Sequence, residues 1–216
     1  MNDFNLFIGA ILAANIIFSM RGFKDAVFFH KYKFNIGGIR AGENIRYFTS
    51  AFLHVDTSHL IFNMLTFYFF APVVTGVLGD IKMLAIYLAS LLLGNIFAYF
   101  YHKNNYGYSA VGASGAVMGI LYSAILLYPD MSLYLFFIPI PIPAWAFGIV
   151  YLGYSIYGMK RGRNNIGHEA HIGGAIAGYM ITIAFVPSIL QTNLWIVLLL
   201  AAPILLLYIL TRMGKL

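Results

Sequence analysis

Seven stretches of this chain carry almost no charge over the length of a helix, and this feature constrains the fold most. They cover residues 4–20, 59–79, 82–101, 112–128, 143–159, 169–188 and 193–211. A helix that crosses a bilayer needs about 20 apolar residues. Seven such helices occupy most of a chain of 216 residues, so little room remains for a soluble domain. The sequence therefore predicts an all-α, polytopic membrane protein.

The composition supports the same class of protein. Only 9% of the residues are charged and 61% are hydrophobic. A soluble domain has roughly 25% charged residues, with which it covers a water-facing surface. Lys and Arg outnumber Asp and Glu by 13 to 7, but nucleic acid is not an expected partner for so apolar a chain. Cysteine is absent, which excludes disulfides, thiolate metal sites and a cysteine nucleophile.

The segment between the first two apolar stretches, residues 21–58, is too charged to cross a bilayer. It holds six Lys and Arg residues among many Phe and Tyr residues. Aromatic and basic side chains are common where a membrane meets water. We interpret this segment as a loop at the membrane surface, which either supports a site or only packs against the helices.

Polar side chains inside the apolar stretches are costly and often mark function. His59 and Asn63 are separated by four residues, so both lie on one helical face and can donate hydrogen bonds to a common point. The alternative is that they only bridge neighbouring helices, as His and Asn often do in membranes.

Ser114 follows a polar segment and therefore lies in the first turn of the fourth predicted membrane helix, between Gly112 and Gly115. The free N–H groups and positive end of a helix favour a developing oxyanion at that place. The alternative is that Ser114 and its neighbouring glycines only allow close helix packing, because Gly115 and Gly119 form a pair of small residues four apart.

His171 lies on a helical face with Gly174 and Gly178. Glycines on that face allow a neighbouring helix to come unusually close. If that neighbour carries Gly115 and Gly119, then His171 reaches Ser114. The pair can then act as a general base and a nucleophile.

Two other interpretations of these histidines fail on spacing. Zinc proteases use histidines four residues apart, whereas His168 and His171 are three apart, so no metal site is expected. A full triad needs a carboxylate on the imidazole, but Glu169 points to another helix face and Asp56 lies in a loop. The sequence favours a dyad.

Taken together, these residues resemble the rhomboid family of intramembrane serine proteases. Four segments carry the resemblance in the family's order, each on a different membrane segment or beside one. They are Glu43-Asn44-Ile45-Arg46, His59-Leu60-Ile61-Phe62-Asn63, Gly112-Ala113-Ser114-Gly115, and Ala170-His171 followed by Gly174 and Gly178. Each segment alone is weak evidence for the resemblance, whereas all four in the family's order are strong evidence.

The resemblance implies a six-helix catalytic core, which we assign to residues 1–190, and a further transmembrane helix in residues 191–216. It implies Ser114 as nucleophile and His171 as base, with His59, Asn63 and the Ser114 N–H as the oxyanion hole. Arg46 would brace the first loop. No cofactor or metal is expected. The expected partners are transmembrane protein substrates and the lipid bilayer.

An alternative to the protease is a catalytically silent rhomboid-like protein that binds membrane clients. Such a protein is expected to lose the serine or the histidine, and this chain has both Ser114 and His171. A small transporter or channel would explain the polar residues in the membrane but not the glycine setting of the serine. We expect a multi-pass protein of the cell membrane.

The chain departs from the family pattern in several places, and two departures bear on the site and on the orientation. A tyrosine that is common in the family four residues after the serine is Met118 here. The orientation that the family implies also leaves only Lys82, of thirteen Lys and Arg residues, on the cytoplasmic side. The positive-inside rule favours the reverse, most clearly through Lys160, Arg161 and Arg163 in a short connection. We keep the family orientation as the expectation.

Overall fold

The computed structural model describes residues 5–134, 140–161 and 167–215; Arg163 lies outside them. Its helices are α1 (Leu6–Lys24), α2 (Ala26–Tyr32), α3 (Ile36–Arg40), α4 (Arg46–Thr49), η1 (Ser50–Phe52), α5 (Thr57–Leu78), α6 (Asp80–His102), α7 (Ser114–Leu127), α8 (Ala144–Arg161), α9 (His168–Phe185), α10 (Ile189–Thr192) and α11 (Leu194–Arg212). Two short antiparallel pairs accompany them: β1 (Phe34–Asn35) with β2 (Ser109–Ala110), and β3 (Ser132–Leu133) with β4 (Ile142–Pro143). The predicted all-α membrane fold is confirmed.

A helix occupies each of the seven apolar stretches, but these helices differ in length. Within the described residues, α1, α5, α6 and α11 are long and apolar enough to cross a membrane. Helix α7 has only 14 residues. At 1.5 Å per residue it is roughly 21 Å long, shorter than the hydrocarbon core of about 30 Å.

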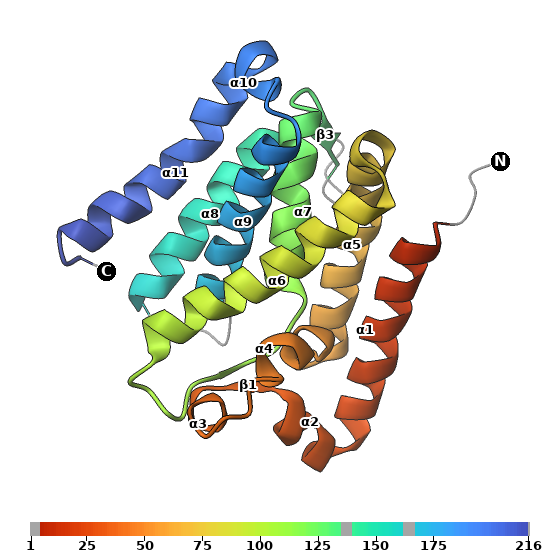
Figure 1. Ribbon diagram of the computed structural model, residues 1–216, viewed down its shortest axis with the longest axis vertical. Coiled ribbons are helices and arrows are strands. Elements are labelled where there is room, and N and C mark those ends of the chain that lie inside the picture. Colours follow the sequence, from red (N-terminus) through yellow and green to blue (C-terminus); the bar gives the residue numbers. More distant parts are fainter. Residues whose placement is uncertain (1–4, 135–139, 162–166, 216) are drawn as a thin grey trace.

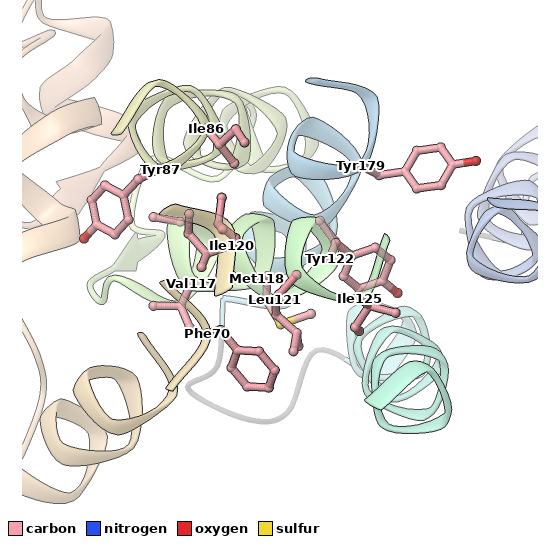
Figure 2. Packing of buried hydrophobic residues seen from close by; sticks show 14 of the residues in the cluster. Phe70, Ile86, Tyr87, Val117, Met118, Ile120, Leu121, Tyr122, Ile125 and Tyr179 are labelled. Carbon is pink, nitrogen blue, oxygen red and sulfur yellow. The ribbon is translucent and has the colours of Figure 1, made fainter. Parts of the chain in front are cut away.

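Helix α7 lies in the middle of the bundle, between α5, α6, α8 and α9, whereas α1 and α11 lie on opposite flanks (Figure 1). Its residues from Gly115 to Leu126 are all buried. Figure 2 shows its side chains pointing outward in several directions toward the surrounding helices. A helix that is apolar all round belongs in such an interior position.

Glycines let α7 and α9 pack with their backbones in contact. A Cβ atom added to Gly174 would collide with the carbonyl group of Gly115, and one added to Gly178 would collide with that of Gly119. Ser123 and Thr182 extend the same contact, because the Thr182 hydroxyl donates to Ser123 Oγ at 2.6 Å. In lipid the hydrophobic effect does not attract helices to one another, so close packing at small residues and hydrogen bonds between side chains hold them together.

One end of the bundle gathers the elements that form the site. The first loop, with α2, α3, α4 and η1, lies at the end where α5, α7 and α9 begin (Figure 1). The β1–β2 pair ties this loop to the segment that precedes α7. His59, Ser114 and His171 each lie within the first turns of those three helices, so the fold places them at the same end.

Candidate active site

Ser114 is the first residue of α7, and the start of this helix has no side-chain cap. Four other helices are capped by a side-chain oxygen, from Asn5, Asp25, Asn35 and Asp56. At α7 the preceding residue is Ala113, which makes no such bond. The first N–H groups of a helix have no partner within it. The N–H groups of Ser114 and Gly115 therefore have no partner within α7 and can serve an acceptor beside the helix.

His171 reaches this serine directly. Its Nε2 lies 2.6 Å from Ser114 Oγ, a short hydrogen-bond distance. The close approach of the two helices makes this reach possible, because a Cβ atom on Gly115 would lie only 3.0 Å from the Ala170 carbonyl oxygen. A larger residue at Gly115 would press on the turn of α9 that carries the imidazole.

The other ring nitrogen of His171 faces a residue that the sequence did not suggest. Tyr151, on α8, has its hydroxyl 3.3 Å from His171 Nδ1, and the two rings lie 5.5 Å apart at an angle of 34°. No spacing rule relates two residues on different helices, so only the fold brings this pair together. The sequence offered one indirect signal: position 118, where a tyrosine is common in the family, is a methionine, so an aromatic neighbour of His171 had to come from elsewhere.

His59 and Asn63 lie on the facing wall, on α5. Gly112, with φ of 129°, brings the backbone against the His59 ring: a Cβ atom there would lie 2.9 Å from His59 Nε2 and 3.7 Å from Ser114 Oγ. A side chain is disfavoured at Gly112 on both counts. Asn63 Nδ2 donates to the His59 carbonyl at 3.0 Å, and the amide has a second hydrogen to offer.

These groups share one pocket of about 570 Å³. Its polar lining comprises Asp56, His59, Asn63, Thr66, Ser114 and His171, and its apolar lining includes Phe62, Val117, Met118, Leu121, Phe147 and Tyr151. It is thus a largely apolar cavity with a few polar groups, the usual form of a ligand-binding site.

His54 supports the segment before Ser114, a role that the sequence did not predict. Its Nδ1 lies 2.8 Å from Ser19 Oγ, whose hydroxyl donates to the Phe52 carbonyl at 3.0 Å. A hydroxyl has one hydrogen, so Nδ1 must be the donor in the first contact. Nε2 is then the acceptor for the Ala113 N–H at 3.5 Å.

The surroundings of His54 keep its ring neutral. The pKa of His54 is lowered to about 3, chiefly by burial and also by the nearby His59, while the Asp56 carboxylate opposes the shift. A protonated ring would have no lone pair for the Ala113 N–H, so the neutral form is the one that holds the segment before the serine.

Arg46 lies away from the pocket and ties the first loop together. Its Nη1 donates to the carbonyl groups of His30 and Lys33 at 2.9 and 2.8 Å, at the end of α2, and its Nε donates to the Glu43 carboxylate. The arginine side chain is about 10% exposed. These contacts link α4 to the end of α2 within the loop.

The structure directs Glu169 to another face of α9. Its carboxylate accepts a hydrogen bond from the Tyr108 hydroxyl at 3.3 Å and lies 3.2 Å from His102 Nε2. Burial and the nearby carboxylate raise the pKa of Tyr108, so it remains a hydroxyl donor. His168 lies beside His171 with the ring centroids 6.1 Å apart.

The fold and the site define a class of protein: a multi-pass membrane protein with a serine and a histidine in contact at the start of two interior helices. The comparisons with known proteins agree with this class. The Rhomboid domain matches residues 41–188, well over half of the chain. The chain belongs to the rhomboid family.

Three relatives illustrate the similarity. RHOMBOID-like protein 12, mitochondrial, from Arabidopsis thaliana is 31% identical over 191 residues, which are 81% of this chain and 56% of that protein. Rhomboid protein 1, mitochondrial, from Saccharomyces cerevisiae is 30% identical over 61% of this chain and 39% of its own length. Rhomboid protease GluP from Bacillus subtilis is 32% identical over 68% of this chain and 27% of its own length.

This chain thus spans about half the length of the Arabidopsis protein and less of the other two. The relatives support an integral, multi-pass membrane protein. The expectation of the cell membrane gains no support from them, because two of the three are named as mitochondrial.

Proposed function

We propose that this protein is an intramembrane serine protease that uses a Ser114–His171 dyad. The observation that carries the proposal is the 2.6 Å contact between His171 Nε2 and Ser114 Oγ in a pocket at the open start of α7. A nucleophile and a base within hydrogen-bond reach are what acyl transfer requires. One relative, from Bacillus subtilis, is named as a rhomboid protease.

In the proposed reaction, His171 Nε2 takes the proton of Ser114 Oγ as this oxygen attacks the scissile carbonyl carbon. The carbonyl oxygen becomes an oxyanion, which accepts hydrogen bonds from the Ser114 N–H, His59 and Asn63. His171 then gives its proton to the leaving amine, and an acyl-enzyme remains. Water, deprotonated by His171, hydrolyses the ester and frees Ser114.

The length of α7 supports cleavage below the membrane surface. This helix is roughly 21 Å long, about 9 Å less than the hydrocarbon core. If Leu127 lies at one boundary of the hydrocarbon, Ser114 lies beneath the other. The substrates are then membrane proteins cut within or close to a transmembrane segment, and the cavity must admit water to that depth.

The test compares wild-type protein with Ser114→Ala and His171→Ala in detergent or vesicles. A fluorophosphonate probe should label the wild type and neither variant, and only the wild type should cleave a model transmembrane substrate. The two residues act as a unit, so the double variant should be no slower than either single variant. A folded wild type that neither reacts nor cleaves would overturn the protease and favour the silent client-binding alternative.

We further propose that the pocket opens on the extracytoplasmic side. Lys82 and Lys103 lie at opposite ends of α6, and the chain contains no cysteine. Single variants Lys82→Cys and Lys103→Cys in intact cells therefore report the orientation. A membrane-impermeant maleimide should modify position 103 and spare position 82; the opposite pattern would place the pocket on the cytoplasmic side.

A further inference from the structure

We propose that Tyr151 is the residue that orients His171, so that the pair of the proposed protease is served by a third side chain from α8. The proposal rests on the proposed function. Its basis is the contact of 3.3 Å between the Tyr151 hydroxyl and His171 Nδ1, on the opposite side of the ring from Ser114. In serine hydrolases with a triad a carboxylate takes this place.

If His171 is the base for Ser114, the proton count fixes the direction of the Tyr151–His171 hydrogen bond. A neutral imidazole has one N–H, and a base that accepts the serine proton at Nε2 must carry that hydrogen on Nδ1. Nδ1 then donates to the tyrosine oxygen. With the hydrogen on Nε2 instead, His171 would donate to Ser114 Oγ and could not accept its proton. The proposed role of Tyr151 is therefore to accept the Nδ1 hydrogen, which holds His171 in the tautomer that can react.

The Tyr151 hydroxyl also stabilises the protonated form of His171. When His171 has taken the proton, both ring nitrogens carry hydrogens, and the Nδ1–H still has an acceptor in Tyr151. A hydroxyl brings no charge into an apolar cavity, whereas an unpaired carboxylate there would be expensive to bury. Glu169, the acidic residue nearest to His171 in sequence, does not take this place, because its carboxylate contacts Tyr108 and His102.

The tyrosine ring is itself held in place. Phe147, one turn earlier on α8, stacks on it with the centroids 5.8 Å apart and the planes at 27°. The Tyr151 ring continues this stack onto His171 at 5.5 Å. Three rings thus run along one wall of the pocket and end at the base, which restricts rotation of the imidazole.

The sequence departure at Met118 gains an explanation from this stack. Met118 lies on α7 and lines the same pocket, but it offers neither an aromatic face nor a hydroxyl. In this chain an aromatic neighbour of His171 comes from α8 instead. The aromatic partner and the hydrogen-bond acceptor are then a single residue, Tyr151.

The experiment measures the rate of fluorophosphonate labelling per folded molecule in Tyr151→Phe, which retains the ring and loses the hydroxyl. Loss of the hydrogen bond between the Tyr151 hydroxyl and protonated His171 should slow labelling about tenfold. Substrate cleavage should show a lower kcat with KM unchanged. The matched control is Tyr122→Phe, which removes a buried hydroxyl bond to α8, from Tyr122 to the Gly148 carbonyl at 3.0 Å. The control should label at the wild-type rate.

A second readout does not depend on any change in rate. In protein with ¹⁵N-labelled histidine, the signals of His171 are assigned among six histidines by their loss in His171→Ala. The wild type should show a hydrogen on Nδ1, and Tyr151→Phe should show a mixture of tautomers. A wild-type hydrogen on Nε2, or a Tyr151→Phe variant that labels as fast as a reactive wild type, would overturn the role of Tyr151 alone. A wild type without Ser114-dependent labelling would overturn the protease itself.

Discussion

Helices α7 and α11 are both strongly apolar, yet they have opposite relations to the rest of the protein. In α7, every residue from Gly115 to Leu126 is buried, and glycines bring it into backbone contact with α9. In α11, only Ile196, Val197, Leu200, Pro203 and Leu207 are buried among 19 residues. The first helix is surrounded by protein, whereas most of the second is left for lipid.

Of these two helices, the one that is long enough to cross a membrane is not the one that carries a residue of the candidate site. Helix α11 is long and apolar enough to span a bilayer, and α7 is too short. The short helix is the one that begins at Ser114, inside the bundle and without a side-chain cap. A helix can begin below the surface only where other helices shield its free N–H groups from lipid.

The largest expected effect comes from the wall that faces Ser114. His59→Ala and Asn63→Ala each remove a proposed oxyanion donor, and loss of one such donor typically slows turnover by about 10²–10³-fold. Turnover of a transmembrane substrate at equal folded fraction is the measurement. Thr75→Ala, which removes a hydroxyl near the far end of the same helix, should keep the wild-type rate. Wild-type turnover in both alanine variants would restore the view that these residues only join helices.

The next effect would break the α7–α9 contact itself. Gly174→Leu should force the two helices apart, because even a Cβ atom there collides with the Gly115 carbonyl. Overpacking typically costs about 1–3 kcal/mol. A small shift of His171 from Ser114 should also slow the reaction about 10²-fold.

The matched control for that contact is Gly76→Leu on α5, because a Cβ atom added there meets nothing within 4 Å. Thermal midpoint and turnover are measured for both variants. The control should keep both values, or rise in stability because glycine is a poor helix former. Equal results for Gly174→Leu and Gly76→Leu would show that the glycine face does not hold α9 in place.

Much of this architecture could be predicted because it depends on local sequence patterns, namely apolar stretches and the spacing of residues along a helix. Each of the seven apolar stretches forms a helix, and the spacing of His171, Gly174 and Gly178 predicted a face that the structure packs against α7. Tyr151 and His54 could not be found in this way. Each acts across elements distant in sequence: Tyr151 on a histidine 20 residues later, and His54 on Ser19 and Ala113. Periodicity carries no information on such pairs.

A smaller effect concerns His54, which joins α1 to the segment before Ser114. Its folded pKa, about 3, lies below the unfolded value near 6.5. The unfolded chain therefore binds more protons between these values, and stability rises with pH there. Stability should be greatest above pH 6.5 and should fall as the pH drops toward 3. His54→Gln should reduce this slope in thermal unfolding between pH 7 and pH 4; an unchanged slope would assign it to other groups.

The smallest effect should come from the flank that α11 occupies. Tyr179, on α9, donates its hydroxyl to the Val197 carbonyl at 3.0 Å, and Trp145 on α8 meets Trp195 with ring centroids 6.5 Å apart. Tyr179→Phe removes the hydrogen bond and retains the ring, so stability should fall by about 0.5–1.5 kcal/mol. The bond lies eight residues along α9 from His171, on the side toward α11, and the reacting groups keep their contacts. Turnover per folded molecule should therefore equal that of the wild type while the thermal midpoint falls slightly. A loss of turnover comparable to that of Gly174→Leu would mean that α11 helps to hold the site, and the contrast between the two helices would fail.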